Sequence, residues 1–154
     1  MAPLNSYFGM GMNDYLYAKG SMATGREIGN FNGTAALCSQ SGEKFFKAII
    51  EKCFAEEDDS ELISLLRTHN LRSLYNKITS KYELSASSKD CKWLGDFYFD
   101  ARYPGENFVL VTEEDAVECL AILEKIKSDA EKLLEEEDRR RSAAREKATT
   151  FKCF

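Results

Sequence analysis

The residues best suited to chemistry lie in one segment, residues 96–105, whose sequence is DFYFDARYPG. Pro104 cannot continue a helix and disfavours helical geometry at Tyr103, so the segment predicts that Arg102 lies at a helix terminus. A guanidinium there can hold a phosphate or carboxylate through its planar fork, and the aromatic rings beside it can stack a base. In the structural alternative, the rings belong to the core and Arg102 pairs with one of three acidic residues, Glu43, Asp96 or Asp100.

Between these alternatives we expect Arg102 to be half-buried, with its stem against Tyr98 and its head near a cleft shared with His69 or Glu43. His69 is the chain's only histidine, and histidine is the side chain that most readily exchanges a proton near neutral pH. A general base needs a nucleophile or a second acid within reach, and the sequence offers no obvious one. The sequence therefore favours a helix-entry role for His69 over a ligand contact or catalysis.

Four polar residues share one face of a helix that we predict over residues 34–54: Gln40, Glu43, Lys44 and Lys47. Glu43 and Lys47 form an i,i+4 pair in the favourable order, which contributes about 0.2–0.5 kcal/mol on a helix surface. This face is either solvated or contacts a ligand or a second copy of the chain. The candidate ligand-binding residues are therefore Arg102, Tyr103, His69, Glu43, Lys44 and Lys47, and we predict no catalytic residue.

The sequence predicts no metal site and no cofactor. Its five cysteines form no C-x-x-C pair, and a single histidine leaves no usual set of zinc ligands. Four of the five fall inside apolar helical patterns, so we expect buried thiols in a reducing compartment. The cysteines are Cys38, Cys53, Cys91, Cys119 and Cys153.

Apolar residues recur at three- and four-residue spacing along most of the chain, which predicts helices rather than strands. We expect helices from Asp14 to about Ile28, over residues 34–54, around residues 62–66, and over residues 71–78. Two capping boxes, Ser87-x-x-Asp90 and Thr112-x-x-Asp115, predict the starts of two further helices. The fold class is therefore all-α, an antiparallel up-and-down bundle of four or five helices.

Composition and charge indicate one globular domain with a charged end. The 154 residues are 44% apolar and 31% charged, with a net charge of −5. This balance argues against a dedicated duplex nucleic-acid binder, although a local basic patch is compatible with it. We assign residues 1–134 to the bundle and residues 135–154 to a charged helical extension that either frays in solvent or binds a partner. The start has no signal-peptide pattern and no apolar run spans a membrane, so we expect a cytoplasmic protein without membrane contact.

Four motifs in this order give the sequence a resemblance to a known family. Asp14-x-x-x-Ala18 opens the first helix, and residues 38–47 (CSQSGEKFFK) lie on the second. Thr68-His69-Asn70-Leu71 and Ala101-Arg102-Tyr103-Pro104 follow. Over about residues 10–134 the chain resembles the HEPN domain (higher eukaryotes and prokaryotes nucleotide-binding). The resemblance implies a bundle of four or five helices, a homodimer, and a small nucleotidyltransferase of the minimal type as partner.

The resemblance also implies a catalytic motif, and this chain departs from that motif. Many HEPN ribonucleases carry an Arg followed by a His four to six residues later, but here Arg67 precedes His69 by two residues and no His follows Arg102. We therefore expect a non-catalytic binding module that acts with a nucleotidyltransferase-type protein, a nucleotide or RNA. The alternatives are a divergent metal-independent ribonuclease toxin of a toxin–antitoxin pair and a purely structural dimerisation module.

Overall fold

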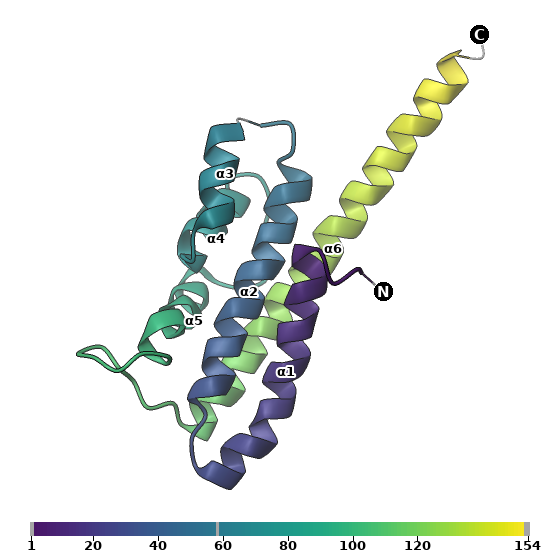
Figure 1. Cartoon of the computed structure of the whole chain (residues 1–154). Coiled ribbons are helices and arrows are strands. Elements are labelled where there is room, and N and C mark those ends of the chain that lie inside the picture. The colour runs from purple at the N-terminus through teal and green to yellow at the C-terminus, as the bar shows by residue number, and fades with distance from the viewer. Residues whose placement is uncertain (1, 58, 153–154) are drawn as a thin grey trace.

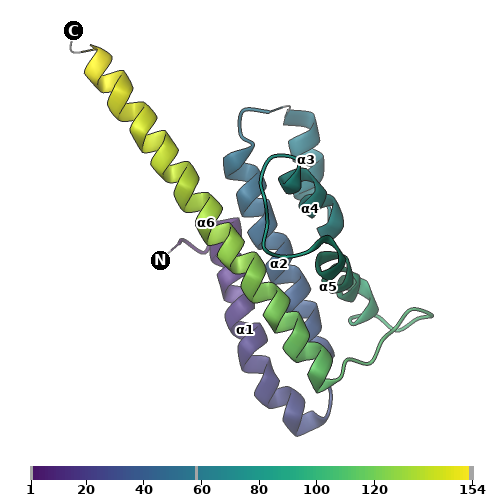
Figure 2. The same cartoon turned by 180° about the vertical axis from the view of Figure 1, so that it is seen from behind.

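The computed structural model describes residues 2–57 and 59–152, and every regular element in that part of the chain is an α-helix (Figure 1). This confirms the all-α class. The helices are α1 (Tyr7–Ile28), α2 (Asn32–Cys53), α3 (Asp59–Arg67), α4 (Leu71–Thr79), α5 (Ser88–Asp100) and α6 (Glu113–Lys152). Consecutive long helices α1, α2, α5 and α6 alternate in direction, and the short helices α3 and α4 connect α2 to α5 (Figures 1 and 2).

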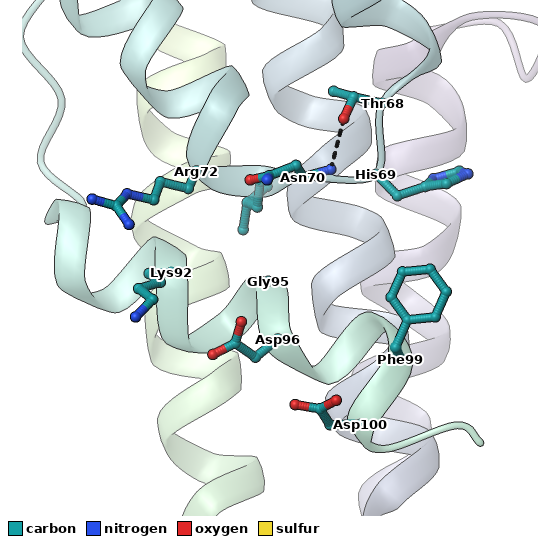
Figure 3. A pocket seen from close by; sticks show the side chains of 10 residues that line it. Thr68, His69, Asn70, Arg72, Lys92, Gly95, Asp96, Phe99 and Asp100 are labelled. Carbon is teal, nitrogen blue, oxygen red and sulfur yellow. Dashed lines mark hydrogen bonds between the residues drawn. The ribbon is translucent and has the colours of Figure 1, made fainter. Parts of the chain in front are cut away.

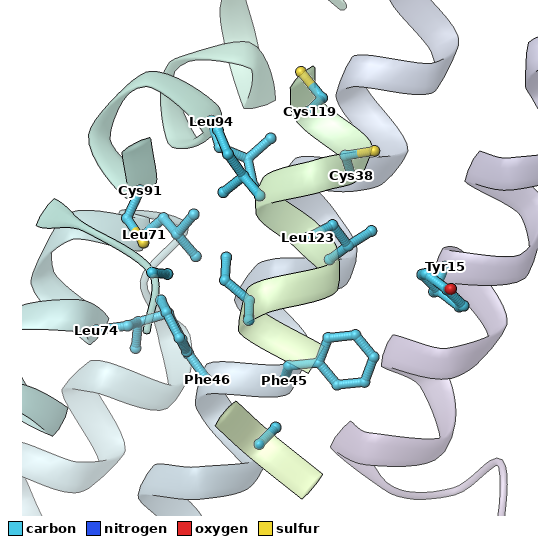
Figure 4. Close-up of a cluster of buried hydrophobic side chains, with 14 of the residues drawn as sticks. Tyr15, Cys38, Phe45, Phe46, Leu71, Leu74, Cys91, Leu94, Cys119 and Leu123 are labelled. Carbon is cyan, nitrogen blue, oxygen red and sulfur yellow. The ribbon is translucent and has the colours of Figure 1, made fainter. Parts of the chain in front are cut away.

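Helix α2 is the centre of the bundle. It packs against α1 and α6 on one side and against α4 and α5 on another (Figure 2). Most of its residues are therefore buried, as expected for a helix that has neighbours nearly all round. Its buried rings Phe45 and Phe46 pack against Phe8 of α1 and Tyr75 of α4, with centroids 5.4 Å and 6.3 Å apart, and Figure 4 shows the core around them. The largest fully buried side chains include Phe45, Phe46, Ile49, Leu71, Leu94, Leu123 and Ile126.

Helix α1 buries a narrow stripe of side chains against its neighbours α2 and α6. Tyr15, Ala18, Met22 and Gly25 are all buried there. The helix begins at Tyr7, seven residues before the predicted start, because the Ser6 hydroxyl accepts a hydrogen bond from the Gly9 amide at 2.9 Å. It ends at Gly29, whose φ of 72° lies in the left-handed region that glycine adopts without strain.

Both predicted helix starts are confirmed: Ser87 caps α5 through its hydroxyl, and Thr112 and Asp115 form a complete capping box at the start of α6. The Asp90 amide donates to the Ser87 hydroxyl at 3.1 Å. The Asp115 amide donates to the Thr112 hydroxyl at 3.1 Å, and the Thr112 amide donates back to the Asp115 carboxylate at 3.2 Å. These bonds satisfy amides that have no partner inside the helix.

Four of the cysteines are free and buried, as predicted, and Cys153 lies outside the described residues. Burial raises the pKa of Cys38 and of Cys91 to about 12, so both thiols stay protonated at neutral pH. These side chains act as small core residues. Within the described ranges, no helix is long and apolar enough to cross a membrane.

Candidate ligand-binding site

A buried carboxylate on α2, that of Glu43, holds His69 in position. Glu43 is 6% exposed, and its Oε2 accepts a hydrogen bond from Lys47 Nζ at 3.1 Å. Its Oε1 lies 2.9 Å from His69 Nδ1. Because an ionised carboxylate only accepts hydrogen bonds, Nδ1 is the protonated ring nitrogen. Glu43 therefore fixes both the position and the tautomer of His69.

Stacked aromatic and guanidinium groups extend from His69 to the surface of the protein. The His69 ring lies parallel to the Tyr98 ring, with centroids 4.4 Å apart and an interplanar angle of 12°. The Arg102 guanidinium carbon lies 4.8 Å from the centroid of Tyr98 and 5.2 Å from that of Tyr103. The rings of Phe99 and Tyr98 are nearly perpendicular, and their centroids are 4.7 Å apart. We call these five residues the aromatic stack.

Beside the stack, a groove of about 510 Å³ opens between the start of α4 and the length of α5 (Figure 3). Arg72 and Lys92 lie at one end of it, and His69 and Phe99 lie at the other (Figure 3). Neither of these two cations takes part in an ion pair among the described residues. The groove lining is completed by Thr68, Asn70, Leu71, Gly95, Asp96 and Asp100.

Two carboxylates make the floor of the groove acidic. Asp96 and Asp100 are one helical turn apart on α5, and Figure 3 shows both beneath the α4 start. Partial burial, and to a smaller extent the charge of Asp100, raises the pKa of Asp96 above its ordinary value, while Lys92 opposes the shift. The groove therefore combines two cations with two hydrogen-bond acceptors for hydroxyl or amino groups.

The turn between α3 and α4 holds His69 over α2. The Asn70 amide donates to the Thr68 hydroxyl at 3.1 Å, drawn as the dashed line in Figure 3, and the Asn70 side chain caps α4 by accepting from the Ser73 amide at 3.1 Å. Gly95 lets α5 approach this turn, because a Cβ at that position would lie 3.0 Å from Cβ of Leu71. The groove exists where these two backbones come close.

The segment that carries Arg102 and Tyr103 is held by Asn32, the first residue of α2. The buried Asn32 amide group donates to the carbonyls of Ala101 at 3.0 Å and Val109 at 2.7 Å. Its side-chain oxygen accepts from the Val111 amide at 2.8 Å. We call this arrangement the Asn32 clamp. The sequence does not predict it, because no sequence signal distinguishes a buried clamp from an ordinary turn asparagine.

The structure brings five of the six predicted ligand-binding residues into one region, and it separates the sixth. Arg102, Tyr103, His69, Glu43 and Lys47 form a continuous chain of contacts through Tyr98. Lys44 lies elsewhere, in an ion pair with Asp14 of α1.

Two expectations about these residues were wrong. Arg102 is exposed rather than half-buried, and it contacts rings rather than a carboxylate among the described residues. The proposed solvated face of α2 is not solvated at Glu43 and Lys47, because the turn before α4 covers them. Arg72 and Lys92 were not identified from the sequence, because isolated surface cations carry no spacing signal.

No group of three or more histidine, cysteine or acidic residues is placed to hold a metal ion in the part of the chain that the structure describes. The chemical groups at the site are guanidinium, ammonium, imidazole, carboxylate and aromatic side chains.

Comparison with known proteins decides the family. The family model of the HEPN domain matches residues 17–136 of the chain. The chain belongs to the HEPN domain family. No curated protein and no solved structure matches it. Every residue of the aromatic stack and of the groove lies inside the HEPN match, whereas the outer end of α6 lies beyond it.

Proposed function

We propose that this HEPN protein is a non-catalytic binding module whose ligand is a nucleotide, held in the groove between α4 and α5. The observation that supports the proposal is the exposed ring of Phe99 at one end of a groove whose other end carries Arg72 and Lys92. A base stacks on an aromatic face, and phosphates pair with guanidinium and ammonium groups. The groove volume lies within the usual range for small-molecule sites.

The other residues of the site have secondary roles in this proposal. Asp96 and Asp100 accept hydrogen bonds from ribose hydroxyls, and Arg102 extends the stacking surface beyond Phe99. Glu43 and Lys47 do not touch the ligand, because both are buried beneath His69. Their role is to hold His69, and through its ring Tyr98, in a fixed orientation.

Isothermal titration of the full chain with AMP, ADP, ATP and GTP tests the proposal. Phe99→Ala is expected to weaken binding by about fivefold or more, because stacking of one base contributes about 1–3 kcal/mol. Arg72→Gln is expected to weaken binding of the triphosphates more than that of AMP. The matched control is Phe108→Ala, which removes another exposed ring, 43% exposed against 59% for Phe99, outside the groove. Equal affinities for Phe99→Ala and Phe108→Ala, or no binding at millimolar nucleotide, would contradict the proposal.

A second candidate function, metal-independent cleavage of RNA, is favoured by one observation. His69 is oriented by a buried carboxylate and shares the Tyr98 ring with Arg102, although the two residues are far apart in the sequence. An oriented imidazole can act as a general base, and a guanidinium can stabilise a phosphorane-like charge. This arrangement differs from the Arg–His spacing of the HEPN ribonucleases.

We expect the purified protein to leave RNA intact, because the chain lacks the Arg–His spacing of the HEPN ribonucleases and its single histidine has no evident catalytic partner among the described residues. Labelled structured and unstructured RNA, incubated without added metal and resolved on denaturing gels, provides the measurement. Cleavage that disappears in both His69→Ala and Arg102→Ala would replace the binding proposal with the ribonuclease.

A homodimer and a nucleotidyltransferase-type partner belong to the same proposal. Support comes from α1, where Leu16 and Tyr17 expose 61% and 67% of their surface beside Leu37 of α2. Apolar side chains gathered on one face are typical of surfaces that bind another protein. This face lies on α1 and α2, away from the groove between α4 and α5.

A further inference from the structure

The outer end of α6, residues 138–152, differs in charge from the rest of the molecule. We call it the C-terminal arm. It holds six cationic and two acidic residues, a net charge of +4, whereas the remainder holds 15 cationic and 24 acidic residues, a net charge of −9. Both views show the arm continuing away from every other helix (Figures 1 and 2). A single basic helix thus projects from an acidic body.

Glu137 fixes the direction in which the arm leaves the bundle. Its buried carboxylate accepts hydrogen bonds from Arg140 Nη2 at 2.6 Å and from Arg141 Nε at 3.0 Å. Arg141 also donates from Nη2 to the Lys52 carbonyl, at the end of α2, at 2.6 Å. The hydrogen bonds from Arg140, and then those from Arg141, lower the pKa of Glu137 to about 2. The base of the arm is therefore a fixed, ionised joint at neutral pH.

Beyond this joint the arm is free of the bundle. Residues 142–150 are all exposed. Arg139, Arg145 and Lys147 form no ion pair among the described residues, so their charges are available to a partner. Arg139 and Lys147 are eight residues apart, about 12 Å along the helix, which is the length of about three to four phosphates in one strand of nucleic acid. Arg145 lies on another side of the helix, so a strand that contacts all three residues winds around the arm.

We propose that the C-terminal arm binds the phosphate backbone of single-stranded nucleic acid through Arg139, Arg145 and Lys147. Charge complementarity favours a long polyanion at the arm, which has a net charge of +4, over the body, which has a net charge of −9. The body disfavours a duplex more than a single strand, because a duplex carries about twice the charge per unit length. The three side chains are guanidinium and ammonium groups, which pair with phosphate oxygens, so the proposed contact is made to phosphates rather than to bases. The inference goes beyond the nucleotide site and does not depend on it.

The test measures binding of fluorescein-labelled 20-nucleotide oligo(U) and oligo(dT) to the full chain by fluorescence anisotropy across a series of salt concentrations. The arm variant is Arg139→Gln/Arg145→Gln/Lys147→Gln. We expect it to bind both probes at least about tenfold more weakly at low salt, and to lower the slope of log K against log [salt] by about 2, because each lost phosphate contact in a single strand contributes about 0.7.

The matched control, Lys89→Gln/Lys125→Gln/Lys132→Gln, removes the same charge from exposed positions on the body that form no ion pair with a described residue, two of them on α6. It is expected to keep nearly the wild-type affinity and slope. Equal losses in the two triple variants, or no loss in the arm variant, would overturn the proposal.

Two further measurements keep the result interpretable. Far-UV circular dichroism checks that the arm variant stays helical. Light scattering at low salt asks whether the arm instead binds the acidic body of a second copy; a fall in mass for the arm variant with unchanged oligonucleotide affinity would contradict the proposal. The arm variant is expected to keep its affinity for ATP, so failure of the arm and failure of the groove are separate outcomes.

Discussion

Lys47→Met is expected to lower the free energy of unfolding by about 3–5 kcal/mol, because it leaves a buried carboxylate without its charged partner. Lys47 and Glu43 are 5% and 6% exposed, and the ammonium lies 3.1 Å from Oε2 of Glu43. His69 still reaches the other carboxylate oxygen, so the loss should fall toward the lower end of that range. Chemical denaturation of the wild type and the variant at pH 7 gives the measurement.

Two controls separate the ion pair from the loss of a lysine. Lys52→Met removes a lysine whose carboxylate partner, Asp138, has a side chain that is 63% exposed, and it should cost clearly less. The double variant Glu43→Gln/Lys47→Met removes both charges and should recover much of the loss, because the buried carboxylate is gone. A single variant Lys47→Met within about 1 kcal/mol of wild type would contradict the structure of this pair.

Asn32→Ala is expected to destabilise the protein by about 2–4 kcal/mol, because it leaves the Val111 amide and two carbonyls without their partner. The same change should free the segment between α5 and α6, so the amides of Val109 and Val111 should exchange with solvent faster than those of α2. Chemical denaturation measures the first effect, and hydrogen exchange followed by NMR measures the second.

Two further substitutions test which hydrogen bonds of Asn32 hold this segment. Asn32→Asp keeps the shape and the acceptor for Val111 but cannot donate to the carbonyls of Ala101 and Val109, so it should also destabilise. Asn30→Ala removes a neighbour that bonds Asn32 itself, and its effect should be much smaller. Equal effects of Asn30→Ala and Asn32→Ala would show that the clamp does not hold the segment.

Local signals in the sequence predicted most of the helices and their starts. The three- and four-residue spacing of apolar side chains is set by the helix itself, and Ser87 and Thr112 act within one turn of their own positions. Pro104 correctly indicated the end of α5, which stops at Asp100. These features need no knowledge of the rest of the chain.

The site depended on packing that local signals do not encode. An i,i+4 pair of Glu and Lys has the same pattern on a solvated face as in a core, and the burial of Glu43 and Lys47 depends on how the turn before α4 lies across α2. Lys44 is adjacent to Glu43 in the sequence, yet the helical rotation of one residue directs it to Asp14 on α1. Arg102 is exposed because it follows the end of α5, where its guanidinium meets the exposed Tyr103 ring as well as Tyr98.

We expect a nucleotide to occupy the groove between α4 and α5. NMR titration of the ¹⁵N-labelled full chain with ATP tests this directly, because chemical-shift changes locate the ligand without any substitution. Saturable shifts should be concentrated at residues 68–72 and 92–100, with the amides of Arg72, Gly95 and Phe99 among the most affected. Shifts confined to other helices, or none at millimolar ATP, would contradict it.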